Sequence, residues 1–312
     1  MAMKSIEICA GAGGQAIGLE SAGFHHEVLV EIDKHACETL RINRKHWNVV
    51  EQDVRHFDAK EYRERIDLFA GGVPCPPFSI AGKQLGPEDE RDLFPEVIRL
   101  VSEIMPRAIM IENVKGLLSN KFYDYRKKIE TELMKIGYLA EWKLLNAMDF
   151  GVPQSRQRTI MVAMPKELMT VFNWPQPKAS TENTVADVLY DEMSSMGWSN
   201  FDNWHAQARS TAPTLVGGSK KHGGADLGPT RAREAWLKLG IDGKGIADSP
   251  PINGYDGLPR LTVKMAALIQ GFPKDWVFYG KKTAAYRQVG NAFPPPVAEA
   301  VGREIYKVLA ND

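Results

Sequence analysis

The stretch Ser5-Ile6-Glu7-Ile8-Cys9-Ala10-Gly11-Ala12-Gly13-Gly14 decides the fold of this chain. Its apolar first part predicts a buried strand, and the glycines that follow predict a turn. A helical pattern over residues 15–22 comes next. Strand, glycine turn and helix in this order are typical of an open α/β sheet, in which ligands bind beyond the carboxyl ends of the strands.

The same alternation of short apolar runs and helical patterns continues to residue 165. It predicts the α/β class, with a doubly wound, mostly parallel sheet. The expected strands are Ser5–Ala10, Glu27–Glu31, Val49–Gln52, Asp67–Ala70, Ala108–Ile111, Leu139–Asn146 and Thr159–Ala163, and the expected helices are Gln15–Ala22, Lys34–Asn43, Leu93–Ile104 and Tyr123–Ile136.

Composition changes near Asn173, and from there to about Pro259 the chain is rich in Gly, Pro, Ser, Trp and Asn with weak periodicity. This predicts a smaller, loop-rich domain or a long insertion. Regular patterning resumes at Thr262–Gln270 and closes with a helix over Pro294–Leu309. We therefore expect residues 1–172 and 260–312 to form one domain and residues 173–259 a second.

The bulk composition is that of an ordinary globular protein, with 44% hydrophobic and 25% charged residues. Three cysteines, an odd number without metal-ligand spacing, predict neither a disulfide framework nor a metal site. No apolar run is long enough to span a bilayer and no signal peptide is visible, so we expect a cytoplasmic protein without membrane contact. The net charge of zero disfavours a wholly basic nucleic-acid binder, but residues 205–245 hold seven basic and three acidic residues.

A cysteine among prolines, Pro74-Cys75-Pro76, follows the fourth expected strand. Proline fixes its own φ and pushes the preceding residue toward extended geometry, so the thiol is held on a stiff turn. A nucleophile that must stay aimed needs such a setting. The alternative is a rigid loop in which the cysteine is incidental.

Reactive side chains follow one expected strand after another. Glu31 ends the second strand, Asp53 follows the third, Cys75 follows the fourth and Glu112 follows the fifth, while a glycine turn follows the first. Because carboxyl ends of parallel strands share one edge of the sheet, these groups should converge there.

The glycine turn is not a complete dinucleotide fingerprint, because Ala16 stands where that pattern has glycine. Glu31 could bind ribose hydroxyls or be a solvated carboxylate. Asp53 could accept from an adenine amino group or cap the next segment. Together they predict an adenosine-containing cofactor without a pyrophosphate.

Glu112 ends an apolar strand, where desolvation would raise its pKa and let it act as an acid. Arg156 and Arg158 stand two residues apart, so on a strand both would point to one face. They could orient an anionic or carbonyl-bearing substrate, or one of them could pair with the glutamate.

These motifs resemble those of the DNA (cytosine-5)-methyltransferases and occur in that family's order along the whole chain. Glu7 and Cys9 stand where the family usually has Asp and Phe, and Pro76 stands where it commonly has Gln. The matching segments are Ile6–Gly14, Glu31-Ile32, Asp53-Val54, Gly72–Ser79, Glu112–Val114, Gln154–Arg158, Arg260–Thr262, Gln270–Pro273 and Tyr286–Pro295.

The resemblance implies the Rossmann-like fold of class I methyltransferases, with S-adenosyl-L-methionine as cofactor and S-adenosyl-L-homocysteine as product. It implies catalysis by Cys75 as nucleophile on carbon 6 of cytosine and Glu112 as acid, with Arg156 and Arg158 beside the ring. The implied cofactor-binding residues are Cys9, Gly11, Gly13, Gly14, Glu31, Ile32, Asp53, Val54, Pro74, Asn291 and Ala292.

The resemblance also implies a double-stranded DNA substrate whose cytosine is flipped out, residues 173–259 as target-recognition domain, and Phe78–Pro95 as a closing loop. It implies a monomer of a restriction-modification system, associated with the nucleoid, with a cognate restriction endonuclease acting separately. The implied DNA contacts are Ser79, Lys83, Arg209, Ser219, Lys220, Lys221, Arg231 and Arg233.

Three alternatives remain at this point. An RNA cytosine-5 methyltransferase would share the catalytic set, although an insertion of recognition size favours DNA. A nicotinamide oxidoreductase is disfavoured by the broken glycine pattern. A catalytically inactive DNA-binding regulator is disfavoured because Cys75, Glu112 and Arg158 are all present.

Overall fold

A computed structural model describes residues 2–74, 92–177, 183–217 and 225–312. By their contacts the residues form two units, each taken by itself below. The first unit comprises Met1–Leu145, Gln157–Gln176 and Val297–Asp312, and the second comprises Asn146–Arg156 and Pro177–Pro296. These bounds differ from the expected domains, because residues 260–296 group with the second unit. The assignment of catalytic and recognition domains stays a prediction.

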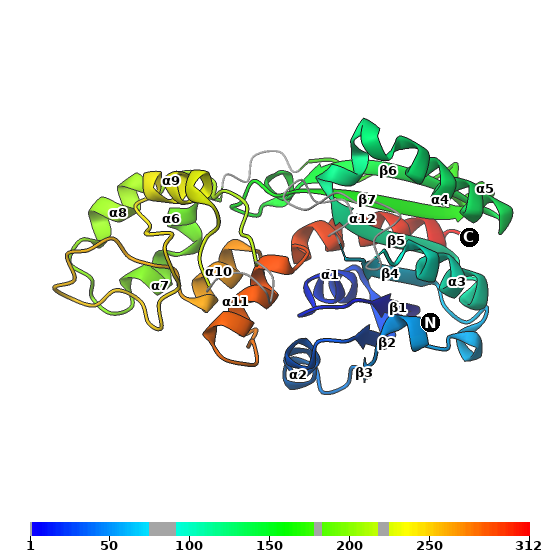
Figure 1. Ribbon diagram of the computed structural model, residues 1–312, viewed down its shortest axis with the longest axis horizontal. Coiled ribbons are helices and arrows are strands. Elements are labelled where there is room, and N and C mark those ends of the chain that lie inside the picture. Colours follow the sequence, from blue (N-terminus) through cyan, green and yellow to red (C-terminus); the bar gives the residue numbers. More distant parts are fainter. Residues whose placement is uncertain (1, 75–91, 178–182, 218–224) are drawn as a thin grey trace. The chain divides into compact units, whose positions relative to one another are not determined.

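The first unit is built on a seven-stranded sheet in the order β3-β2-β1-β4-β5-β7-β6 (Figure 1). The pairs β1–β2, β1–β4, β2–β3 and β4–β5 are parallel, whereas β7 runs antiparallel to β5. The α/β class with a mostly parallel sheet is therefore confirmed. The strands are β1 (Met3–Ile8), β2 (Phe24–Glu31), β3 (Val49–Glu51), β4 (Leu68–Gly72), β5 (Ala108–Val114), β6 (Tyr138–Asn146) and β7 (Gln157–Pro165).

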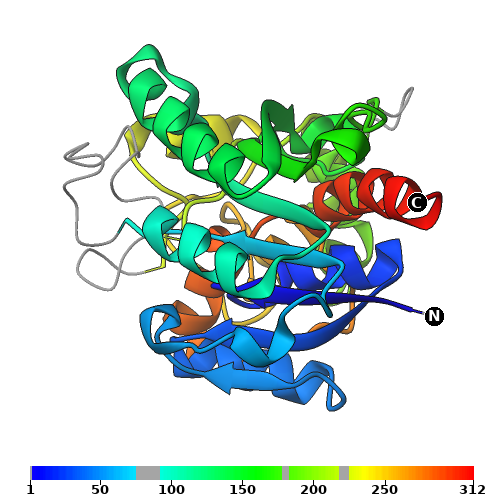
Figure 2. The same cartoon turned by 90° about the vertical axis from the view of Figure 1, so that its right-hand side faces the viewer.

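Helices cover both faces of this sheet (Figure 2). Alternate strand residues such as Ile6 and Ile8 share one buried cluster with α3 (Phe94–Ile104) and α4 (Tyr123–Lys135). Elsewhere in this unit, α12 (Pro295–Ala310) crosses α1 (Gly14–Ala22) so closely that a Cβ on Gly302 would lie 2.9 Å from Leu19.

The remaining helix of the first half, α2 (Lys34–Asn43), has the predicted bounds. Asp33 caps it, because its carboxylate accepts from the main-chain N–H groups of His35 and Ala36. The second unit contains more helix than its composition suggested. Its helices include α6 (Val185–Val188), α7 (Tyr190–Ser194), α8 (Phe201–Gln207), α9 (Thr230–Lys238), α10 (Val263–Ile269) and α11 (Lys282–Asn291).

Several predicted strand ends differ from the structure by one to three residues, and two of these errors concern site residues. β5 runs on to Val114, so Glu112 and Asn113 lie within the strand, paired with β7. β1 ends at Ile8, and Cys9 has a φ of 51° in the turn that follows. Among the described helices, none is both long and apolar enough to cross a membrane.

His26 is a buried histidine on β2, only 3% exposed. Its Nε2 lies 2.9 Å from the Ala16 carbonyl oxygen and its Nδ1 lies 2.8 Å from the Ser5 hydroxyl. Since a carbonyl only accepts, Nε2 carries the hydrogen and Nδ1 accepts from Ser5. Burial lowers the pKa of His26 to about 4.

The pKa of His26 predicts acid lability, because the unfolded chain binds a proton there near pH 6.5 and the folded chain does not. Stability from this group is present above pH 6.5 and is lost as the pH falls toward 4. We expect wild type to lose about 2 kcal/mol more than a His26→Gln variant between pH 7 and pH 5. Urea unfolding of both proteins at the two pH values measures the difference, and equal losses would contradict it. Glu20, His25 and His46 also affect the pKa of His26, but both proteins contain them, so their own titration does not contribute to the difference.

Candidate active site

The carboxylate of Glu31 lies buried at the carboxyl edge of the sheet. It is 8% exposed. One oxygen accepts from the main-chain N–H of Gly11 at 2.7 Å, and the other accepts from those of Ile32 and Asp33 at 2.8 and 2.7 Å. Burial raises the pKa of Glu31, and these three donors oppose that rise. The glutamate thereby ties the end of β2 to the glycine turn after β1.

The glycine turn offers bare main chain beside this carboxylate. Gly11 and Gly13 have φ values of 55° and 89°, which favour glycine. No atom lies within 4 Å of the position that a Cβ on Gly11 would take. Gly14 begins α1. The turn therefore leaves room for a ligand to approach the backbone closely.

Next to Glu31, the side chain of Ile32 is 66% exposed, an unusual state for a large aliphatic residue at a strand end. Asp53 accepts from the N–H of Arg55 at 3.0 Å and so caps a short 3-10 turn. Val54 is 4% exposed and belongs to the core of the sheet. Because the Val54 side chain packs in the core, only its main-chain groups could contact a cofactor.

Two further groups at this edge have raised pKa values. Burial, with a smaller effect of Glu31, raises the pKa of Glu7 well above its usual range. Burial and the neighbouring carboxylates of Glu31, Asp53 and Glu7 raise the pKa of Cys9 strongly. Cys9 is consequently a thiol, not a thiolate, and is no candidate nucleophile.

Glu112 lies directly beside the end of β4. Gly72 and Glu112 are register partners in the parallel pair, and a Cβ on Gly72 would lie 3.4 Å from the glutamate Oε2. Cys75 stands three residues beyond Gly72 in the sequence, outside the described residues. The pairing thus places Glu112 beside the end of the strand that precedes Cys75 in the sequence.

Arg158 is the partner of Glu112. Its Nε donates to Glu112 Oε1 at 2.9 Å, and the two side chains are only 15% and 10% exposed. Arg158 comes from β7 and Glu112 from β5, adjacent strands of the sheet. The prediction that an arginine pairs with Glu112 is therefore the alternative that the structure shows. A guanidinium and a carboxyl group lie in contact at this point of the sheet.

Asn113 is a residue that the sequence analysis missed. It is fully buried, and its Nδ2 donates to the carbonyl of Val73 at 3.5 Å. Its Oδ1 accepts from the N–H of Val114 at 2.8 Å. The side chain thus joins β5 to the start of the turn at Pro74. The sequence offers one signal for this role, which is an asparagine directly after the acid Glu112.

Arg156 does not share a strand face with Arg158, so that prediction is wrong. β7 begins at Gln157, one residue after Arg156. The guanidinium of Arg156 is buried in the second unit, on the main-chain carbonyls of Leu215, Gly290 and Ala292. Asn291 is exposed at the end of α11, and Ala292 caps that helix.

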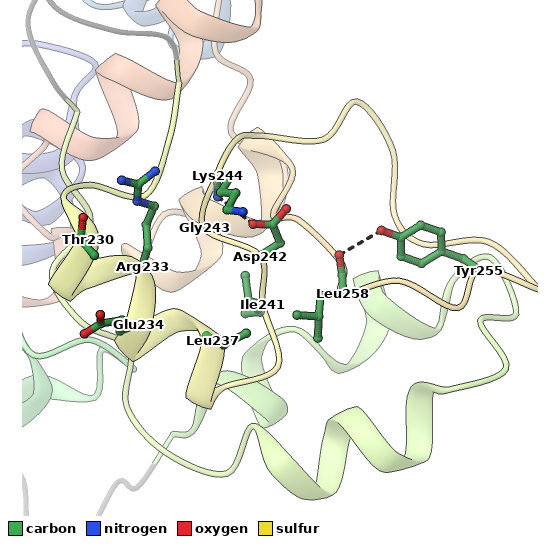
Figure 3. Close-up of a pocket in the computed structure, with 10 residues that line it drawn as sticks. All are labelled: Thr230, Arg233, Glu234, Leu237, Ile241, Asp242, Gly243, Lys244, Tyr255 and Leu258. Atoms are coloured by element: carbon green, nitrogen blue, oxygen red, sulfur yellow. Dashed lines mark hydrogen bonds between the residues drawn. The ribbon is translucent and has the colours of Figure 1, made fainter.

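Three of the predicted DNA contacts are described, and all belong to the second unit. Arg209 and Arg231 are exposed. Arg233 lines a cavity of about 580 Å³ together with Lys244 and Tyr255 (Figure 3). Within the described part of the chain, neither Arg233 nor Lys244 makes a side-chain ion pair.

The remaining predicted site residues lie outside the described residues. They are the nucleophile Cys75, the contacts Ser79, Lys83, Ser219, Lys220 and Lys221, and most of the expected closing loop Phe78–Pro95.

Comparison with known proteins identifies the family. A family model described as C-5 cytosine-specific DNA methylase matches residues 3–307. The type II methyltransferase M.NgoMIV of Neisseria gonorrhoeae is 53% identical, over 100% of both chains. M.NaeI of Lentzea aerocolonigenes, also a type II methyltransferase, is 52% identical over 98% of this chain and 75% of its own.

A solved structure agrees. A prophage-encoded protein of E. coli, described as a DNA modification methyltransferase, has a TM-score of 0.70 at 25% identity and covers 100% of both chains. These matches exclude a nicotinamide oxidoreductase and do not favour an RNA substrate. The chain belongs to the C-5 cytosine-specific DNA methylases, the enzymes that methylate carbon 5 of cytosine in DNA.

Proposed function

We propose that this enzyme methylates cytosine in a specific double-stranded DNA sequence, with S-adenosyl-L-methionine as methyl donor and a covalent bond between Cys75 and carbon 6 of the base. The observation that carries the proposal is the Glu112–Arg158 pair, 2.9 Å apart, beside the strand that leads to Cys75. An acid and a guanidinium at this point match the two polar edges of a cytosine ring that is attacked by a thiolate.

The residues at the sheet edge fit S-adenosyl-L-methionine. When bound, the cofactor supplies a methyl group activated by its sulfonium centre. The Oε2 of Glu31 keeps one lone pair that can accept from a ribose hydroxyl, because it accepts from a single main-chain N–H whereas Oε1 accepts from two. The exposed side chain of Ile32 offers an apolar surface for adenine. The open turn at Gly11 admits the chain of the cofactor.

The chemistry assigns one role to each side chain. The Cys75 thiolate forms a bond to carbon 6, and the electron pair of the carbon 5–carbon 6 double bond becomes nucleophilic at carbon 5. Glu112 donates a proton to the ring nitrogen, and Arg158 binds the ring carbonyl oxygen. After carbon 5 gains the methyl group, its proton leaves to a base, the double bond re-forms as Cys75 departs as thiolate, and the ring nitrogen returns its proton to Glu112.

The DNA contacts follow from the same proposal. A cytosine inside a duplex cannot reach such a site, so the base must be flipped out at a cost of about a few kcal/mol. We assign phosphate or base contacts to Arg209, Arg231 and Arg233 of the second unit, none of which forms an ion pair with another residue that the structure describes.

The relatives M.NgoMIV and M.NaeI are type II methyltransferases, which supports a role in restriction-modification. A cytoplasmic, nucleoid-associated monomer would suit that role, with a cognate endonuclease acting separately on the same sequence.

The proposal is tested by incubating the protein with labelled S-adenosyl-L-methionine and either mixed-sequence duplex DNA or RNA. Label should enter the DNA, and bisulfite sequencing should place 5-methylcytosine within one short sequence. Label in RNA alone, or modified bases scattered without a common sequence, would contradict the proposal.

A Glu31→Gln variant is expected to bind the cofactor about ten- to a hundred-fold more weakly, since hydrogen bonds to a charged acceptor contribute roughly 1.5–3 kcal/mol each. Calorimetric titration with S-adenosyl-L-homocysteine measures this loss. Glu51→Gln is the matched control, because Glu51 is the register partner of Glu31 on β3 but is exposed and pairs with Arg41. Unchanged affinity in Glu31→Gln, or an equal loss in both variants, would refute the role of Glu31.

A further inference from the structure

Arg156 is a charged side chain with only 1% exposure. Its Nη1 donates to the Leu215 carbonyl at 2.7 Å, and its Nη2 donates to the Gly290 and Ala292 carbonyls, both at 2.9 Å. The last two carbonyls stand at the end of α11, where a helix favours a cation. The side chain thus joins stretches of the second unit that are far apart in the sequence.

Gln154 and Arg156 both form hydrogen bonds to the main chain of Leu215. The Oε1 of Gln154 accepts from the Leu215 N–H at 2.8 Å, while Arg156 donates to the Leu215 carbonyl. Upstream, the N–H of Ser155 donates to the Ala212 carbonyl at 2.8 Å. Residues 212–217, called here the clamped segment, therefore run beside residues 153–156 and are fixed by their side chains.

A second amide closes the network. The Nε2 of Gln154 donates to the Oε1 of Gln270 at 2.6 Å, and the Nε2 of Gln270 donates to the Ala292 carbonyl at 2.6 Å. Both glutamines are fully buried. Because buried amides and guanidinium groups are costly when their partners move away, this network has one preferred arrangement.

The clamped segment ends in a close crossing over α11. A Cβ on Gly217 would lie 2.6 Å from the Arg287 carbonyl oxygen, and a Cβ on Gly290 would lie 2.5 Å from the Gly217 Cα. Real Cβ atoms do not approach other atoms so closely. The crossing therefore requires glycine on both sides, and any larger residue would displace the segment from the helix.

We propose that Arg156 is a positioning residue for DNA binding, which acts through the clamped segment and does not contact the reacting cytosine. In the sequence the clamped segment directly precedes the stretch with Ser219, Lys220 and Lys221, the predicted DNA contacts, which lie outside the described residues. This inference rests on the proposed function. It moves Arg156 from the catalytic set to the DNA-binding unit, and it leaves Arg158 as the arginine beside the base.

The test uses Arg156→Lys, Gly217→Ala and the double variant. Wild type first supplies a duplex that carries its mapped methylation site. Steady-state kinetics then give KM for that duplex and kcat at saturating duplex, and titration gives Kd for S-adenosyl-L-homocysteine. Each single variant should raise KM for DNA about ten-fold, with kcat and the cofactor Kd within about two-fold of wild type. The double variant should be no worse than the more damaged single variant, because both changes release the same segment.

Gly254→Asn is the control, because Gly254 also lies in the second unit, has a φ of 76° that asparagine accepts, and has no atom within 4 Å of its Cβ position. It should behave as wild type.

A fall in kcat with unchanged KM in Arg156→Lys would mean contact with the base and overturn the inference. The inference would also be overturned if KM for DNA, kcat and the cofactor Kd all worsened equally together with a lowered Tm. Additive effects of the two substitutions on KM in the double variant would overturn it as well. If Arg156→Lys does not fold, an unchanged KM in Gly217→Ala overturns it alone. A wild type that methylates no DNA would instead refute the proposed function.

Discussion

Replacement of Cys75 by serine is expected to lower methyl transfer by about four orders of magnitude or more, the range found when a covalent nucleophile is removed. A thiol supplies thiolate near neutral pH, whereas a hydroxyl in the same place stays protonated and reacts poorly with carbon 6. Cofactor binding should be unchanged, because Cys75 is not among the residues proposed to bind the cofactor, which include Glu31, Ile32 and Gly11.

Neither of the two described cysteines, Cys9 and Cys37, can replace Cys75. Burial raises the pKa of Cys37 to about 12, and its Sγ donates to the Glu31 carbonyl at 3.4 Å. Burial and nearby carboxylates likewise keep Cys9 protonated. Cys37→Ala is therefore the control and should retain activity.

The measurement combines methyl transfer with a covalent trap. Duplex DNA in which the target base is 5-fluorocytosine has no carbon 5 proton to lose, so the bond to the enzyme should persist on a denaturing gel. Wild type and Cys37→Ala should form this adduct, and Cys75→Ser should not. An adduct with Cys75→Ser, or activity within about ten-fold of wild type, would show that another group attacks the ring.

The parallel part of the sheet could be predicted because its strands are short apolar runs and its turns carry their own signals. Asp33 caps α2 within the same local stretch, so the predicted and observed bounds of that helix agree. Glu31 and Glu112 could be placed at one edge because parallel strands end there together.

The parts that could not be predicted depend on partners distant in the sequence. β5 extends through Glu112 because β7, more than forty residues later, supplies antiparallel partners up to Val114. Arg156 finds acceptors at Leu215 and Ala292, which no local pattern around Gln154–Arg158 indicates. Short helices such as Val185–Val188 and Tyr190–Ser194 are too brief to show a period.

Disruption of the Glu112–Arg158 pair should have the next largest effect after loss of Cys75. Glu112→Gln removes the acid that serves the ring nitrogen and should lower kcat by about 10²–10⁴-fold. Arg158→Ala removes a donor to the ring carbonyl and should lower kcat by about 10²–10³-fold. Since the two side chains are 2.9 Å apart, the double variant should lose much less than the product of the two single losses.

Lys115→Ala provides a matched control beside the same pair of strands, because Lys115 directly follows β5 and its partner Gln157 begins β7. The Lys115 Nζ donates to Gln157 at 2.8 Å, next in sequence to Arg158, but this contact is exposed. A surface contact of that kind contributes roughly 0–1 kcal/mol, so the control should keep wild-type kcat. If the losses of Glu112→Gln and Arg158→Ala instead multiply, the two groups act on independent steps. In that case the ion pair would be a feature of the free enzyme only, and the proposal that Glu112 and Arg158 bind the cytosine ring together would be wrong.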